Sequence, residues 1–258
     1  MTGHPDPPAL SVRGLSHAYA GRPVLRDVTL DVGAGEVVAV VGPSGAGKTT
    51  LFRCLTRLVR PDSGVLEVRG RDLVPLEGAA LREARRELGL VFQSYNLVRR
   101  LTALENVLVG RLAEVPAWRV VLRRFPAQEQ LVAATCLDQV GLLGFAHTRA
   151  DRLSGGQQQR VAIARALASR AGVVLADEPV ASLDPASARS VLTALRSLAV
   201  DHGKAVVCSL HQVDLVPGFA DRVLGLRDGR VVLDVPAARF DAGAARALYS
   251  PVPERTPA

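Results

Sequence analysis

The sequence predicts an α/β protein in which a doubly wound, mainly parallel sheet carries an antiparallel β lobe near the N-terminus and an inserted α-helical lobe. Two observations support this prediction. Four short apolar runs are typical of parallel strands that are covered on both faces. Helical patterns lie between several of these runs, and alternating strands and helices favour a doubly wound sheet.

The N-terminal part is predicted to form the β lobe and then the first core strand. Residues 10–19, LSVRGLSHAY, and residues 24–36, VLRDVTLDVGAGE, alternate apolar and polar side chains. This alternation is typical of antiparallel strands with one solvated face. The run EVVAVVG, residues 36–42, is the first predicted core strand.

Core elements then alternate along the chain. A helix is expected after the first core strand, because apolar residues recur at helical spacing until RPDSG stops the pattern. Further buried strands are predicted in LGLVFQ (88–93), AGVVLAD (171–177) and AVVCSLH (205–211). Asp228-Gly229 lies between two alternating segments and predicts a hairpin. The apolar residues of the expected helix are Leu51, Cys54, Leu55 and Leu58.

The stretch from about residue 94 to 153 interrupts this alternation. It contains LTALENVLVGRLA and AQEQLVAATCLDQVGLL, whose apolar residues lie three and four apart, so it is predicted to be a helical lobe. The tail, 236–258, is expected to hold a short helix and a frayed end. We therefore expect one domain over residues 1–258, with core and β lobe built from about 10–93 and 154–235.

Composition narrows the class of protein. The N-terminus lacks the pattern of a signal peptide and no apolar run is long enough to span a bilayer, so we expect the protein to stay in the cytosol. The net charge is +7, yet basic residues are spread along the chain without a block, and no nucleic-acid partner is predicted. Cys54, Cys136 and Cys208 lack metal-ligand spacing and are expected to be reduced, mostly buried thiols.

The segment GPSGAGKT, residues 42–49, carries the strongest chemical signal. It follows a predicted strand and opens a predicted helix, which is the context of a phosphate-binding P-loop. Backbone N–H groups would hold phosphate oxygens, Lys48 would reach the β and γ phosphates, and the Thr49 hydroxyl would bind Mg²⁺. The predicted ATP-binding residues here are Gly42, Pro43, Ser44, Gly45, Ala46, Gly47, Lys48, Thr49 and Thr50.

Polar residues at the ends of the other core strands predict the rest of the site. In VVLADEP, residues 173–179, Asp177 and Glu178 follow the apolar strand residues at the sheet edge where ligands of open α/β folds sit. Asp177 is expected to help hold Mg²⁺, and Glu178 to act as general base on the attacking water. Gln93 would complete the metal shell, and His211 would contact the γ-phosphate and the water.

A second helix start, LSGGQ, raises a question about its purpose. Ser154 and Gln157 form the pattern of a capping box, which needs no glycines, yet Gly155 and Gly156 occupy the first turn at a cost of about 1 kcal/mol each. We expect an anion to approach this backbone closely. Further on, Asp184 before a proline is an expected helix cap that can also serve function.

These motifs, in this order, resemble the nucleotide-binding subunits of ATP-binding-cassette (ABC) transporters over nearly the whole chain. The resemblance implies that Tyr19 stacks on adenine and that two copies form a head-to-tail homodimer. Each ATP would then lie between one subunit's phosphate loop and the other's signature motif. The implied trans contacts come from Ser154, Gly155, Gly156 and Gln157, and Asp184 is also predicted to bind the nucleotide.

A finer resemblance, to the ATP-binding subunit of bacterial phosphonate importers, is carried by FQSYNLVRRLTALENVLVGRL, WRVVLRRF and SLHQVDL. It implies an ATPase, a translocase motor, that binds two integral-membrane permease subunits at the cytoplasmic face of the inner membrane. An extracytoplasmic substrate-binding protein would act on the same complex. Alternatives are a motor for import of polar amino acids, methionine or phosphate, a soluble cassette ATPase acting on nucleic acid or ribosomes, and a P-loop kinase or GTPase.

Overall fold

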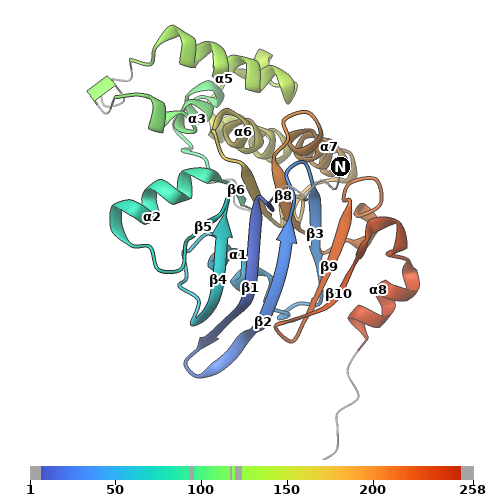
Figure 1. The fold of residues 1–258 in the computed structure, drawn as a ribbon. Helices are drawn as coiled ribbons and strands as arrows, with labels where there is room; N and C mark the ends of the chain where they lie inside the picture. Colours follow the sequence, from blue (N-terminus) through green and yellow to red (C-terminus); the bar gives the residue numbers. More distant parts are fainter. Residues whose placement is uncertain (1–6, 93–95, 117, 120–123, 251–258) are drawn as a thin grey trace, which may run out of the picture.

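The structure is a computed structural model that describes residues 7–92, 96–116, 118–119 and 124–250. Its centre is a six-stranded sheet with the order β10-β9-β3-β8-β7-β6 (Figure 1). Neighbouring strands from β9 to β6 run parallel, and β10 is antiparallel to β9. The four apolar runs are therefore confirmed as core strands. The bounds are β3 Val37–Val41, β6 Leu88–Phe92, β7 Val173–Asp177, β8 Ala205–Ser209, β9 Arg222–Arg227 and β10 Arg230–Pro236.

Strand β3 shows why these runs are continuously apolar. Val37, Ala39 and Val41 pack into one hydrophobic core, whereas Val38 and Val40 pack into the other. The first core holds helices α6 (Gly155–Ala168) and α7 (Pro185–Val200), and the second holds α1 (Lys48–Leu55) and the β lobe. Because both faces of the sheet are covered here, all five residues of β3 are buried, whereas the edge strand β10 keeps every second residue exposed.

The predicted antiparallel lobe is confirmed as a separate sheet of order β2-β1-β4-β5. β1 and β2 pair from Leu10 opposite Val32 to Tyr19 opposite Arg22. Two short strands and a helix that the sequence did not single out complete this region. The bounds are β1 Leu10–Tyr19, β2 Arg22–Val32, β4 Ser63–Val68, β5 Arg71–Asp72 and α2 Gly78–Ala84.

Helix α1 is shorter than its apolar pattern predicts. It ends at Leu55, and Leu58 lies outside it with 60% of its surface exposed, so that part of the prediction was wrong. The chain leaves the helix at Arg57, which has a left-handed backbone with φ of 56°. The Arg57 guanidinium is buried and donates hydrogen bonds to the carbonyls of Leu73, Val74 and Leu76. These hydrogen bonds, to carbonyls 16 to 19 residues further along the chain, favour the end of the helix before the proline-containing turn.

The middle stretch is helical, as predicted, in the part that the structure describes. It includes α3 (Ala103–Val109), which starts with a capping box of Thr102 and Glu105, and α5 (Ala127–Gln139). Figure 1 shows both above the sheet beside α6. Arg111 joins this region to the core, because its guanidinium meets Glu129 at 2.6 Å and donates to the Ala168 carbonyl at 3.0 Å. Single 3₁₀ turns in this stretch are η2 Leu112–Glu114, η3 Leu143–Phe145 and η4 Ala150–Arg152.

The C-terminal part contains the predicted hairpin and the predicted short helix. Arg227 pairs with Arg230 across the Asp228-Gly229 turn. Helix α8 (Ala242–Tyr249) follows after the turn η6 (Ala237–Arg239) and lies beside β9 and β10 (Figure 1).

The cysteine prediction is also confirmed. Cys54, Cys136 and Cys208 are free and buried. Burial raises the pKa of the Cys54 thiol to about 11 and that of Cys208 further still. In the described part of the chain, no helix has the length and apolar character that crossing a bilayer requires.

Candidate nucleotide-binding site

The phosphate loop has a backbone that only glycine can adopt at two positions. Gly42 has a φ of 154°, and a Cβ atom there would lie 2.0 Å from the Leu226 carbonyl oxygen. Gly47 caps α1 in a left-handed conformation, and its Cβ would lie 2.9 Å from the Val24 carbonyl oxygen. The loop therefore packs closely against β2 and β9 and leads directly into α1, whose N-terminal N–H groups can bind an anion.

Lys48 lies at the first position of α1 with only 5% of its surface exposed. Its ammonium donates to the Gly42 carbonyl at 2.6 Å and to the Pro43 carbonyl at 3.2 Å. Burial lowers the pKa of this ammonium, and the nearby carboxylates of Glu178 and Asp177 act in the opposite direction. The lysine is thus held inside the loop, where a phosphate oxygen can replace the two carbonyls.

A cavity of about 310 Å³ brings the predicted residues of three strand ends together. It is lined by Val24, residues 44–50, Glu178 and His211. These residues follow β3, β7 and β8, which are neighbours in the sheet, so their carboxyl ends meet at one edge. The predicted meeting of Lys48, Glu178 and His211 is observed.

Asp177 and Glu178 are held by a residue that the sequence reasoning missed. Ser209, fully buried at the end of β8, donates to the Asp177 carboxylate at 2.7 Å and accepts the Glu178 N–H at 2.8 Å. Burial raises the pKa of the Asp177 carboxyl, whereas this hydrogen bond and Lys48 lower it. One signal was available in the sequence, because Ser209 stands two residues before His211, and alternation would direct both to one side of the predicted strand 205–211.

Glu178 is held in an unusual conformation. Its backbone is left-handed, with a φ of 49°, which is uncommon for a residue other than glycine and concentrates at functional sites. Its carboxylate shares a hydrogen bond of 2.5 Å with Nε2 of His211. The side chain of Glu178 is mostly buried and that of His211 is 40% exposed. The two groups therefore form one polar pair at the mouth of the cavity.

Tyr19 and Gln93 stand apart from this cavity. Tyr19 ends β1, is 41% exposed, and stacks edge-on against His17 with ring centroids 4.7 Å apart. It does not line the cavity, so an adenine on its ring would extend out of the phosphate pocket. Gln93 lies outside the described residues.

The signature segment starts α6 with the predicted capping box. Ser154 Oγ accepts the Gln157 N–H at 3.3 Å, and the Gln157 side chain accepts the Ser154 N–H at 2.9 Å. At Gly156 a Cβ would lie 3.0 Å from both Cβ and Oγ of Ser187. The start of α7 therefore already approaches Gly156 closely, and this packing explains a glycine there without an anion.

Asp184 is the N-cap of α7. Its carboxylate accepts the N–H groups of Ala186 and Ser187, both at 3.0 Å. A hydrogen bond from the Ser187 side chain is the main cause that lowers the pKa of this carboxyl, and the backbone bonds lower it further. None of residues 154–157 or Asp184 lines the phosphate cavity of this chain. The structure thus places the starts of α6 and α7 next to each other, and neither start lines the phosphate cavity of the same chain.

The oxygen donors near the loop suit Mg²⁺. Thr49 lies in the first turn of α1 and lines the cavity, and Asp177 ends β7 within electrostatic reach of Lys48. Hydroxyl and carboxylate oxygens are the ligands that Mg²⁺ prefers, and Mg²⁺ commonly takes the remaining ones from phosphates and water.

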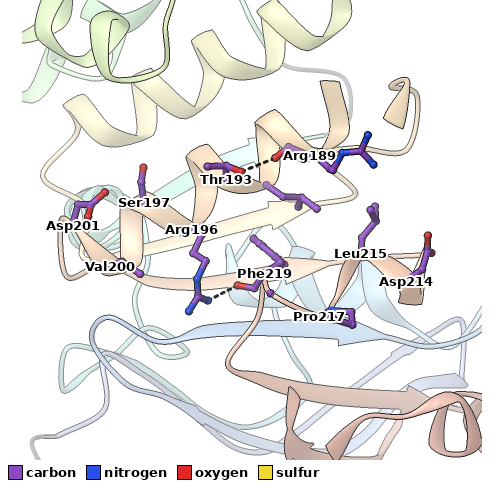
Figure 2. Close-up of a pocket in the computed structure, with 12 residues that line it drawn as sticks. Arg189, Thr193, Arg196, Ser197, Val200, Asp201, Asp214, Leu215, Pro217 and Phe219 are labelled. Atoms are coloured by element: carbon purple, nitrogen blue, oxygen red, sulfur yellow. Dashed lines mark hydrogen bonds between the residues drawn. The ribbon is translucent and has the colours of Figure 1, made fainter. Parts of the chain in front are cut away.

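A larger cavity than the phosphate pocket lies elsewhere among the described residues. It has a volume of about 660 Å³ and lies between α7 and residues 214–219 (Figure 2). Arg196 crosses it and donates to the Phe219 carbonyl at 2.5 Å. None of the predicted site residues lines it, so size alone would point to the wrong place.

Fold and site together define a phosphate-loop nucleotide hydrolase with an added β lobe and helical stretch. Residues 25–181, more than half of the chain, match the ABC transporter family. The chain belongs to this family, and its activity is ATP hydrolysis. The resemblance seen in the motifs is confirmed at this level.

Individual relatives narrow the comparison. The chain is 51% identical over 241 residues to the hypophosphite import ATP-binding protein HtxD of Stutzerimonas stutzeri. This match covers 93% of this chain and 71% of that protein. It is 47% identical over 235 residues to the phosphonates import ATP-binding protein PhnC of Nitratidesulfovibrio vulgaris, with coverages of 90% and 89%. The dimeric structure of MJ0796, a bacterial ABC transporter cassette, has 32% identity and a TM-score of 0.77 over 88% of this chain and 98% of that one.

Proposed function

We propose that this chain is the ATP-hydrolysing motor of an importer for phosphonates. The observation that carries the proposal is the cavity in which the phosphate loop, Glu178 and His211 meet. In a family of transport ATPases, such a cavity has the parts that phosphoryl transfer to water requires: a phosphate cradle, a cation and a base. The cargo is proposed from the relatives that are named for phosphonate and hypophosphite import.

Hydrolysis would use the chain's own groups in distinct roles. Loop N–H groups and the Lys48 ammonium bind the β and γ phosphates. The Glu178 carboxylate orients the attacking water and accepts its proton, while His211, hydrogen-bonded to Glu178, contacts the γ-phosphate. Thr49 and Asp177, with Gln93, would hold a Mg²⁺ ion, which supplies neutralisation of phosphate charge.

The complete site is proposed to form between two copies. Ser154 to Gln157 present helix N–H groups, and Asp184 lies beside them, but neither group lines the cavity of its own chain. A partner copy, packed head to tail, would bring its own signature segment to the γ-phosphate. A dimeric arrangement in the related cassette supports this proposal.

Coupling to permeases is proposed to occur through the helical stretch. An apolar groove of about 400 Å³ runs along α3, where the exposed side chain of Val98 and that of Leu104 face a space that also borders Phe125. A short amphipathic helix of a membrane subunit fits such a groove. This contact would hold the motor at the cytoplasmic face of the inner membrane, where an extracytoplasmic binding protein delivers cargo from the other side.

Hypophosphite is a second candidate cargo, because one relative at 51% identity is named for its import. Uptake of labelled alkylphosphonate and of hypophosphite should be compared in cells that lack this chain, complemented with wild type or Glu178→Gln. We expect alkylphosphonate uptake with the wild type only. Uptake of hypophosphite alone would replace the cargo, and uptake independent of the chain would remove both.

For the purified protein, Glu178→Gln is expected to lower ATP turnover by roughly 10²-fold or more while ATP-dependent dimerisation persists. Steady-state hydrolysis and size-exclusion chromatography with ATP measure the two effects. Normal turnover in the variant would rule out Glu178 as the base.

A further inference from the structure

The C-terminal helix reaches the phosphate loop. Helix α8 ends at Tyr249, whose hydroxyl oxygen accepts the N–H of Gly42 at 3.2 Å, across 207 residues of sequence. Gly42 is the first residue of the loop. The motifs of the sequence gave no role to this part of the chain.

The position of α8 is fixed by built contacts rather than by loose association. Leu248 is only 3% exposed and packs over β9 where Gly225 has no side chain. A Cβ at Gly225 would lie 3.1 Å from Leu248, so a larger residue there would push the helix away. The Arg227 guanidinium also donates to the Ala247 carbonyl at 3.2 Å. The phenol of Tyr249 is therefore delivered to Gly42 by packing on β9.

Gly42 is a position where the loop has little freedom. Its carbonyl accepts a hydrogen bond from the Lys48 ammonium, and its N–H donates to Tyr249. Its φ of 154° sets the relative orientation of these two groups. Burial raises the pKa of the Tyr249 phenol, so the group stays neutral and accepts the N–H through an oxygen lone pair. Without this acceptor, the first peptide of the loop would lose its partner on the β9 side.

We propose that Tyr249 is a positioning residue of the phosphate loop, and that docking of α8 thereby sets the affinity of the site for ATP. The hydroxyl does not touch the phosphates; it holds the Gly42 peptide in the orientation that aims the loop and Lys48. The inference rests on the proposed assignment of residues 42–50 as the ATP site, and it does not depend on the cargo.

The test compares Tyr249→Phe with wild type in the full chain, using a fluorescent ATP analogue. Loss of one hydrogen bond predicts about threefold to tenfold weaker binding. The KM for ATP should rise by a similar factor, with a smaller change in kcat. Ser250→Ala is the matched control, because its Oγ donates to the Arg246 carbonyl at the same helix end without contacting the loop. We expect its Kd to match the wild type.

Leu248→Ala provides a second variant that keeps the hydroxyl but removes the buried anchor of α8. It should also weaken ATP binding. An unchanged Kd in Tyr249→Phe would overturn the inference, and so would equal losses in Tyr249→Phe and Ser250→Ala, which would indicate helix stability alone. A wild-type chain that does not bind the analogue would instead overturn the site assignment and the inference together.

Discussion

The two glycine-containing helix starts, at α1 and α6, look alike in sequence but are built differently. In the phosphate loop, Gly42 and Gly47 have backbones that other residues avoid, and both lie against carbonyl oxygens of neighbouring strands. At the start of α6, Gly156 is part of a regular helix, and its neighbour is the side chain of Ser187. The first glycines shape a pocket, whereas Gly156 allows two helices to approach.

Gly42→Ala should give the largest effect on the α1 side of this comparison. A Cβ 2.0 Å from a backbone carbonyl cannot be accommodated without moving β9 or the loop. We expect loss of ATP-analogue binding together with a marked drop in melting temperature. Normal binding by this variant would show that the loop can relax, and the distinction between the two helix starts would fail.

Gly156→Ala should have an intermediate effect and tests what the α6 glycine is for. Overpacking against Ser187 is expected to cost about 1 to 3 kcal/mol of unfolding free energy, of which about 1 kcal/mol is offset because alanine favours the helix over glycine. The monomer should still bind the ATP analogue. Turnover should fall by roughly 10²-fold, because in the proposed dimer the signature segment would be displaced from the partner's γ-phosphate.

The double variant Gly156→Ala with Ser187→Gly sharpens this result. Removing the Ser187 side chain relieves the overlap but also deletes its hydrogen bond to Asp184, so thermal stability should recover in part. If turnover remained low, the glycine would be needed for the approach of a partner's nucleotide. If turnover also recovered, packing between α6 and α7 would be its whole purpose.

Ser209→Ala tests the hydrogen bonds that hold Asp177 and Glu178 beside the phosphate loop, for which the α6 start has no counterpart in the phosphate cavity. Loss of the hydroxyl leaves the Asp177 carboxylate and the Glu178 N–H without their buried partner. We expect about a tenfold lower kcat, with ATP affinity little changed. Equal kcat values for variant and wild type would mean that β7 alone fixes the Glu178 backbone.

Ser154→Ala should have the smallest effect. Loss of a helix cap costs about 1 kcal/mol, which corresponds to a fall in melting temperature of about 2 to 4 °C for a domain of this size. Thr102→Ala removes the equivalent cap of α3 and is the matched control. ATP-dependent dimerisation should weaken only in Ser154→Ala, and equal behaviour of the two variants would reduce Ser154 to a cap.

The sequence could predict what depends on strand ends and short motifs. Lys48, Glu178 and His211 meet because each follows a buried parallel strand, and apolar runs reveal such strands. Ser209 and Tyr249 were missed, since their roles depend on which strand or helix lies beside them in space. The prediction that Leu58 belongs to α1 was wrong for a related reason, because the hydrogen bonds of Arg57 with residues 73–76 override the helical pattern. The reason for Gly156 also lies in tertiary packing.

The two carbonyl contacts of the Lys48 ammonium have a thermodynamic consequence. Two carbonyls of the loop solvate this cation, so a phosphate that replaced them would exchange one set of charge-assisted hydrogen bonds for another of similar strength. Calorimetry would then record a heat much smaller than a new phosphate–ammonium pair would release. The affinity would come mainly from the loop N–H groups and from water returned to bulk solvent.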